Sequence, residues 1–284
     1  MLKRRKNWIE IRKILHINHG LMFAGMVLPI SPDRAGMTRE EQMDKFEKFC
    51  GEYQKMLSEE KTIVGSVERG RQLVAELTSQ PDWFCSYLER IISHEASAGI
   101  ERAGIWSNEY TIYRSPDKSF IVLAYIWEAG QKDIIHDHNG WGVVGTLFGK
   151  MREKKYKRLD DGTKEGFCEL QEESNEVLGP AETTFVLPLN NGLHVMDNAA
   201  DEIAVSINVY RKLIDRNYIQ SFDPAEKKVT RLFPGRTLRE LLAVKALAEM
   251  DPSQTREILQ KALGPSKPPF LKKEYEEVLQ KLRA

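Results

Sequence analysis

The sequence lacks a net charge and any long hydrophobic run. Its 284 residues include 42 Lys plus Arg and 42 Asp plus Glu, so the formal net charge is zero. A nucleic-acid-binding protein needs a basic face to neutralise phosphates, so we expect no nucleic-acid partner. No apolar run reaches the roughly 20 residues of a transmembrane helix, so we expect no membrane-spanning segment.

Cysteine is also scarce. The three cysteines, Cys50, Cys85 and Cys168, are odd in number and widely spaced. This pattern is not a disulfide framework, and it contains no Cys-x-x-Cys pair for zinc. A reducing compartment, the cytoplasm, is the location that we expect.

The patterning divides the chain into three parts. Residues 1–37 are an N-terminal extension in which a basic cluster precedes an apolar stretch, as in a signal peptide, but other charged residues separate the two. An upstream read-through with Met37 as the natural start is the alternative. Residues 38–232 form the main domain, and residues 233–284 form a C-terminal extension.

The main domain is expected to begin with helices and continue with strands. Between residues 38 and 95, apolar residues recur at helical spacing in three segments. After Gly104 the chain consists of short β-prone runs separated by Gly, Pro, Asn and Asp, and Asp160-Asp161-Gly162 is typical of a hairpin turn. The runs are Tyr110–Tyr113, Phe120–Trp127, Trp141–Phe148, Glu153–Leu159, Thr183–Leu187 and Ile203–Tyr210. The pattern predicts a mainly β fold, either a sandwich or a small barrel.

From about Thr237 the chain is predicted to be helical again. An apolar stripe is followed by a helix restart at Asp251-Pro252-Ser253 and by a final charged helix. These helices are interpreted as a cap on the barrel, and a partner-binding helical hairpin is the alternative.

Two histidine-bearing segments indicate a metal site. In a strand, residues two apart point to the same face, so His136 and His138 can converge on one ion while Asp137 points away. A third histidine, His194, lies downstream in another β-rich segment. Histidines without any metal are the alternative, because a lone His-x-His is a weak signal. Gly130 and Gly149 around the first segment, and the pattern Pro188-x-x-x-Gly192-x-His194-x-x-x-Asn198 in the second, resemble the two motifs of the cupin barrels.

The ligand set that this predicts has no carboxylate. Many cupins place a Glu four or five residues after the second histidine, and those positions here are Gly142 and Val143. Three neutral imidazoles would leave about three coordination positions open on a metal ion with octahedral geometry. Such a site can hold a thiolate and dioxygen together.

The pattern over residues 80–225 resembles the cysteine dioxygenase family of thiol dioxygenases. The resemblance rests on Phe120–Trp127, the two histidine segments and the run Ala204–Tyr210. It implies a cupin-type double-stranded β-helix barrel with helical extensions, in which three histidines hold iron(II). It also implies oxidation of a small thiol, such as cysteine or 3-mercaptopropionate, to a sulfinic acid with dioxygen.

The last predicted strand carries the implied catalytic residues and departs from the family. Ser206, Asn208 and Tyr210 alternate with aliphatic residues and share one face. The family has a Ser-His-Tyr series here, and Asn208 replaces the histidine, so it cannot shuttle a proton near neutral pH. Animal members cross-link this tyrosine to a cysteine. The aligned residue here is Gly142, as in bacterial members, so no cross-link is expected.

Arg114 is the candidate for binding a substrate carboxylate. It precedes the long strand in Tyr113-Arg114-Ser115-Pro116, although another register places Glu109 or Tyr110 there. A solvated arginine before a turn is the alternative. For the whole chain, a different metal-cupin enzyme and a non-catalytic metal or thiol sensor are the alternatives to a thiol dioxygenase. The sequence does not predict the oligomeric state.

Overall fold

The computed structural model describes residues 39–93, 101–102, 105–214, 216–263 and 269–282. The expected extension 1–37 lies outside these ranges. The helices are α2 (Arg39–Glu59), α3 (Ile63–Thr78), α4 (Asp82–Ile92), the short η3 (Leu189–Asn191), α5 (Gly235–Met250), α6 (Pro252–Ala262) and α7 (Pro269–Lys281). None of the helices described is both long enough and apolar enough to cross a bilayer.

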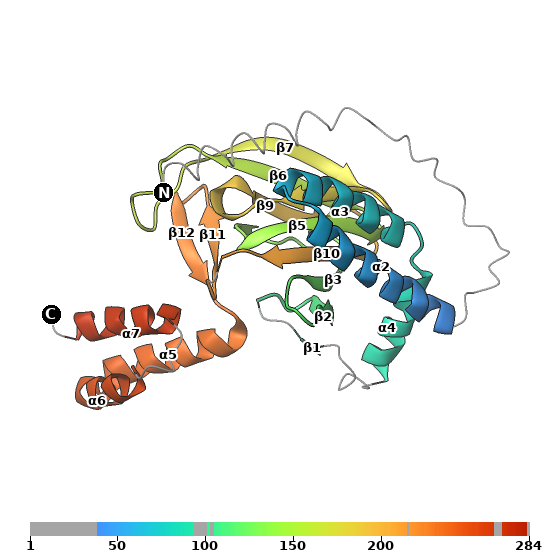
Figure 1. The fold of residues 1–284 in the computed structure, drawn as a ribbon. Coiled ribbons are helices and arrows are strands. Elements are labelled where there is room, and N and C mark those ends of the chain that lie inside the picture. The colour runs from blue at the N-terminus through green and yellow to red at the C-terminus, as the bar shows by residue number, and fades with distance from the viewer. Residues whose placement is uncertain (1–38, 94–100, 103–104, 215, 264–268, 283–284) are drawn as a thin grey trace.

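The strands form two six-stranded antiparallel sheets (Figure 1). The first has the order β1-β2-β3-β10-β5-β8, and the second has the order β12-β11-β4-β9-β6-β7. Their bounds are β1 Glu101–Arg102, β2 Glu109–Arg114, β3 Ile121–Trp127, β4 Ile135–His136, β5 Gly140–Phe148, β6 Met151–Arg158, β7 Leu170–Leu178, β8 Thr183–Val186, β9 Leu193–Asn198, β10 Ala204–Lys212, β11 Ile219–Asp223 and β12 Lys228–Leu232.

The order of strands β3 to β10 gives a double-stranded β-helix. Strands β3, β5, β8 and β10 belong to one sheet, and β4, β6, β7 and β9 belong to the other. The chain therefore passes repeatedly between two facing sheets, which is the eight-stranded jelly-roll topology of cupins. The predicted mainly β, cupin-type barrel with helices at both ends is confirmed.

The helices before the barrel cover the outer face of the first sheet. Thr62 begins α3 by accepting a hydrogen bond from the backbone N–H of Gly65. Val67, Val74 and Leu77 then bury one face of α3 against the sheet, in a core shared with α2 and α4. Because helices cover one face of β5 and the barrel interior lies on the other, all but the last residue of this strand is buried.

A separate core lies inside the barrel. Leu123, Tyr125 and Trp127 of β3 pack there against Met151 and Met196 of the facing sheet. The hydrogen-bonded register assigns other inner positions: the residues of β2 and β10 directly opposite Tyr125 are Glu109 and Ser206. Polar side chains therefore line part of the interior.

The C-terminal helices have their own core. Leu241, Leu259, Leu271, Tyr275 and Leu279 are buried together between α5, α6 and α7. As predicted, a helix restarts after Asp251, whose carboxylate accepts from the N–H of Gln254. In contrast, Asp160-Asp161-Gly162 does not close a tight hairpin, because β6 ends at Arg158 and β7 begins at Leu170. The turn lies within a longer loop.

Candidate metal centre

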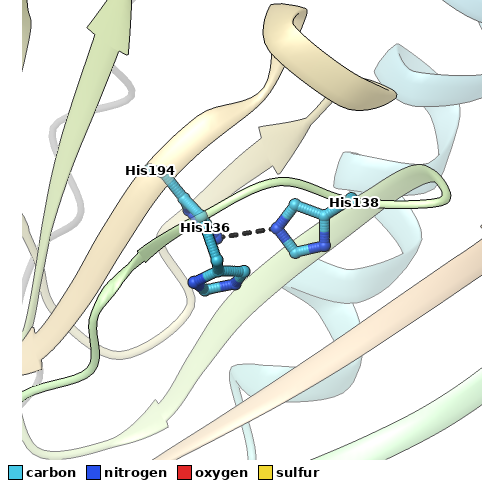
Figure 2. Close-up of side chains that lie close together, drawn as sticks. All are labelled: His136, His138 and His194. Carbon is cyan, nitrogen blue, oxygen red and sulfur yellow. Dashed lines mark hydrogen bonds between the residues drawn. The ribbon is translucent and has the colours of Figure 1, made fainter. Parts of the chain in front are cut away.

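Three histidine side chains meet inside the barrel. His136 ends β4, His138 follows it, and His194 in β9 lies directly opposite His136. The ring centroids of each pair are 4.8 Å apart, and the candidate ligand nitrogens all lie within 4.8 Å of one another. The Nε2 atoms of His138 and His194 are 2.9 Å apart (Figure 2). All three residues are buried.

The two neighbouring histidines reach this point in different ways. The sequence predicted that His136 and His138 share the face of one strand. However, β4 ends at His136, so His138 reaches the site from the following loop. The backbone there is fixed because the carbonyl oxygen of His138 accepts a hydrogen bond from the N–H of Leu189.

Glu153 on β6 orients His194. Its Oε1 lies 2.7 Å from Nδ1 of His194, and its Oε2 accepts a hydrogen bond from Thr184 and lies 3.4 Å from Nζ of Lys155. Burial alone would raise the pKa of the Glu153 carboxyl, but Lys155 and the bond with His194 outweigh it and bring the pKa to about 2. Burial lowers the pKa of His194. A neutral imidazole therefore donates its Nδ1–H to a carboxylate, which leaves the Nε2 lone pair free for an ion.

His136 has a comparable support. Its Nδ1 lies 2.8 Å from the carbonyl oxygen of Ile134 and 3.5 Å from Oδ2 of Asp133. Both oxygens are acceptors, so Nδ1 carries a proton and Nε2 has the free lone pair. Burial raises the pKa of the Asp133 carboxyl, and His136 opposes that rise.

His138 is held by packing. Its ring stacks on that of Tyr210, with centroids 5.3 Å apart and planes 22° apart. Burial lowers the pKa of His138 well below the usual value, and the other two histidines lower it further. Its imidazole is therefore neutral, as a metal ligand must be.

Asp137, between the two histidines, points away from them as predicted. Its Oδ1 accepts hydrogen bonds from Arg216 at 2.6 Å and from the N–H of Gln220 at 2.7 Å. Arg216 also donates to Asn139, so it fixes the loop that carries His138. Asp137 is a structural residue here, not a ligand.

The predicted catalytic residues lie on β10, and the structure brings only two of them together. The Asn208 amide donates to the hydroxyl oxygen of Tyr210 at 3.0 Å. Ser206 instead accepts a hydrogen bond from the indole N–H of Trp127 at 3.2 Å. Burial raises the pKa of Tyr210 strongly, so its hydroxyl keeps its proton. The hydroxyl oxygen of Tyr210 accepts the hydrogen bond from Asn208, so the hydroxyl proton remains available to donate to another group.

Gly142 is directly opposite Tyr210 in the register between β5 and β10. A Cβ at this position would lie 2.2 Å from Cδ1 of Tyr210. The tyrosine ring therefore packs over bare backbone, which accounts for a glycine here.

The candidate carboxylate-binding residue lies at the rim. Arg114 is the exposed last residue of β2 and is opposite Ile121, which in turn is opposite Tyr210. The structure places Arg114 level with Tyr210 but two strands away from it. Glu109, on the same strand, is buried and accepts a hydrogen bond from the hydroxyl of Tyr125 at 3.0 Å.

The sequence did not reveal the carboxylates that support the histidines. Glu153 lies in the run Met151–Arg158, in which six of the eight residues are charged, as in an exposed strand. Burial alternates along this strand, and Met151, Glu153 and Lys155 all occupy its buried positions. Met151 is the one apolar residue at these buried positions, and it was the only indication in the sequence that this face of the strand points inward.

The donor set fits a metal ion. Among the described residues, His136, His138 and His194 form the one group of potential ligands close enough to share an ion, and it contains no carboxylate. One candidate ligand atom from each ring lies within 4.8 Å of those of the other two, and the Nε2 atoms of His138 and His194 face each other. Such nitrogen donors suit zinc, copper, iron and nickel.

Comparisons with known proteins identify no reaction. No family model matches the chain. Similar solved structures include a cupin 2 conserved barrel domain protein from Rhodopseudomonas palustris (13% identity, covering 50% of this chain and 76% of that chain, TM-score 0.32). Another is an RmlC-like cupin from Ralstonia eutropha (15% identity, covering 49% of this chain and 74% of that chain, TM-score 0.31).

An oxalate oxidase in complex with the substrate analogue glycolate is also similar (18% identity, TM-score 0.27), and the match covers 33% of this chain and 42% of that chain. The chain thus spans less than half of that oxidase. At these TM-scores the likeness carries no functional argument, so the assignment rests on strand order and on the buried histidines. The molecule is a cupin-type barrel with a buried three-histidine group that could bind a metal ion.

Proposed function

We propose that this protein is an iron(II)-dependent dioxygenase that oxidises a small thiol to a sulfinic acid. The observation that carries the proposal is the buried group of three imidazoles, without a carboxylate ligand, against the ring of Tyr210. In the reaction, the thiol sulfur would lose its proton and gain both atoms of dioxygen. Iron(II) would supply the redox chemistry, and its open positions would admit thiol and dioxygen.

The surrounding residues would keep the ligands neutral and correctly turned. Glu153 and the carbonyl oxygen of Ile134 hold protons on the Nδ1 atoms of His194 and His136, so Nε2 faces the ion. Tyr210 would direct its hydroxyl proton to a bound oxygen or sulfur atom. Asn208 would fix the direction of that hydroxyl without exchanging a proton.

The substrate would lie between these residues and β2. A carboxylate on the thiol would be bound by Arg114 at the rim through a charge-assisted hydrogen bond. A free-thiol substrate suits a reducing compartment such as the cytoplasm, and the three cysteines are unpaired in the fold.

Oxygen consumption tests the proposal. Protein loaded with iron(II) should consume dioxygen with at least one of cysteine, cysteamine and 3-mercaptopropionate. Mass spectrometry should find a sulfinic acid with both oxygens from labelled dioxygen. The His136→Ala/His138→Ala double variant is the control and should be inactive. Absence of oxygen uptake with every thiol, at full iron loading, would reject a thiol dioxygenase.

A non-catalytic metal cupin that signals to a partner is the second candidate. Two observations favour it. Asn208 cannot relay a proton, and α5–α7 form a unit with their own core, tied to β12 by Arg231, which pairs with Glu274 and Glu277 of α7. The same oxygen measurement separates the candidates, because a sensor would bind metal or thiol without turnover.

A further inference from the structure

The inner face of β2 carries a buried carboxylate without a cationic partner. Glu109 is 8% exposed, and among the described residues its side chain hydrogen-bonds to the neutral hydroxyl of Tyr125. None of the ion pairs in the described part of the chain includes Glu109. A buried carboxylate that lacks a cation is costly and is commonly found where a ligand supplies the charge.

Glu109 is linked closely to the histidine group. Its backbone N–H donates to the carbonyl oxygen of Trp106 at 3.4 Å, and the Trp106 ring lies 5.4 Å from the ring of His136. Burial raises the pKa of the Glu109 carboxyl, the Tyr125 bond lowers it, and both Asp133 and His136 lie near enough to affect it. The carboxylate therefore belongs to the same part of the interior as the candidate metal centre.

Two further buried oxygens on this wall lack a partner among the described residues: the hydroxyl of Thr111, which can accept or donate, and the amide oxygen of Asn208, which only accepts. Their residues are only 4% and 5% exposed. The register places both side chains on the inner face, on either side of Leu123. Buried oxygens without hydrogen-bond partners destabilise a fold unless a ligand or water satisfies them. Together with Glu109, they suit a group that brings several N–H donors and a positive charge.

The basic groups near the histidines are already engaged. Lys155 pairs with Glu153, and Arg216 pairs with Asp137. Arg114, the one cation of β2, is exposed at the far end of that strand from Glu109. A bound thiolate would add one negative charge near Glu109, which an ammonium group on the same molecule cancels and a carboxylate on it doubles.

We infer that Glu109 is a specificity-determining residue that binds an ammonium group of the substrate, so the thiol that this site prefers is a cationic aminothiol. The inference deepens the proposed thiol dioxygenase function and rests on it. Cysteine could be accepted through its ammonium group, whereas a thiol with a carboxylate alone would be disfavoured.

Anaerobic binding to the iron(II)-loaded protein tests this directly. Cysteamine and 3-mercaptopropionate are suitable probes, since each joins its thiol through two methylene groups to a charged end of opposite sign. Optical titration should give a dissociation constant for cysteamine roughly tenfold or more below that for 3-mercaptopropionate, as expected for a charge-assisted hydrogen bond.

The variant Glu109→Gln keeps the size of the side chain and an acceptor for Tyr125 but removes the charge. It should raise the cysteamine dissociation constant roughly tenfold and leave iron content and 3-mercaptopropionate binding unchanged. Glu226→Gln, at an exposed position between β11 and β12, is the matched control and should alter neither ligand.

The outcomes distinguish this inference from the proposed function. Equal or tighter binding of 3-mercaptopropionate by the parent protein, or an unchanged ratio in Glu109→Gln, overturns the ammonium subsite while leaving thiol oxidation intact. The parent protein's preference is informative even if the variant folds poorly. If neither thiol binds nor supports oxygen uptake, both the subsite and the thiol dioxygenase are rejected.

Discussion

Each candidate ligand is held by a different kind of contact. His194 is bonded to the carboxylate of Glu153, His136 faces a backbone carbonyl, and His138 is stacked on Tyr210. The first of these supports is a direct hydrogen bond to a side chain, which a conservative change can alter. A substitution of Glu153 can therefore measure how much a hydrogen bond to a ligand histidine contributes to metal affinity.

Glu153→Gln should weaken iron(II) binding about 10- to 100-fold, the usual effect of losing such a contact. The amide cannot match the charge-assisted bond that fixes the Nδ1 proton of His194. Competition with a chelator would measure the affinity. Glu172→Gln, exposed on the neighbouring strand β7, is the control. An unchanged affinity in Glu153→Gln would mean that His194 is held by its backbone alone.

Tyr210→Phe should lower the rate of thiol oxidation strongly at unchanged iron content. The ring would still stack on His138, so only the hydroxyl is removed. Loss of a proton donor or acceptor that acts in the transition state typically costs about 10²–10⁴-fold in rate. Sulfinate yield and oxygen consumption at matched iron loading would measure this effect.

Asn208→His complements that experiment. Histidine can still hydrogen-bond to the hydroxyl of Tyr210 and can also exchange its proton, so the variant should retain activity or exceed the parent. Full activity in Tyr210→Phe would show that β10 is not the reactive wall. Inactivity of both the parent and Asn208→His would favour the sensor.

At the scale of elements, the packing of α3 on β5 positions the barrel wall. Gly145 lies on the helix-covered face, where a Cβ would come within 2.6 Å of Val74 Cγ1. Gly145→Ala should destabilise the protein by about 1–3 kcal/mol, as overpacking does. Gly51→Ala is the opposite case: Gly51 lies within α2 with nothing near its missing Cβ, so alanine should stabilise by about 1 kcal/mol.

Denaturant unfolding of the two glycine variants would measure both free energies. If Gly145→Ala were as stable as the parent, α3 would be able to move outward without cost, and the tight approach to β5 would not be needed to hold the sheet. Iron content in the same variants would show whether the wall transmits that displacement to the histidines.

Most elements that the sequence predicted coincide with apolar or β-prone segments. The three N-terminal helices have apolar periodicity, strands β2, β3, β5, β6, β8 and β10 coincide with the predicted β-prone runs, and the structure confirms them. Strand β7 was missed because it is an edge strand whose residues, apart from Leu178, are exposed or only half-buried. Its sequence, Leu-Gln-Glu-Glu-Ser-Asn-Glu-Val-Leu, therefore carries no strand signal.

The candidate site was predicted in part for a related reason. The pair of histidines two residues apart, together with the second motif around His194, allowed His136 and His138 to be selected before the fold was known. Asp133 and Glu153 could not be selected, and Glu109 was named only as an alternative to Arg114, because acidic residues are usually exposed. Only the three-dimensional arrangement shows that they are buried beside the histidines.

At the scale of the whole molecule, two hydrophobic units share one chain. The barrel and its covering helices enclose the histidines, whereas α5–α7 enclose a core to which no residue of the candidate site contributes. Arg231 of β12, with its partners Glu274 and Glu277 in α7, is a polar connection between the two units. The ring of Phe233, which packs against the helical core, also lies 5.6 Å from that of Tyr218 beside β11. These contacts are few, so the units can differ in stability.

Metal should therefore stabilise the barrel selectively. An ion that binds only the folded state at 100 times its dissociation constant adds about 2.7 kcal/mol to the free energy of unfolding. Calorimetry with and without iron(II), under anaerobic conditions, should show a rise of several degrees in the barrel transition. A separate transition of α5–α7, where resolved, should stay unchanged. The His136→Ala/His138→Ala variant should show no metal-dependent shift, since only one of the three imidazoles remains. A shift that persisted in this variant would place the stabilising ion elsewhere and remove the three-histidine group as the metal centre.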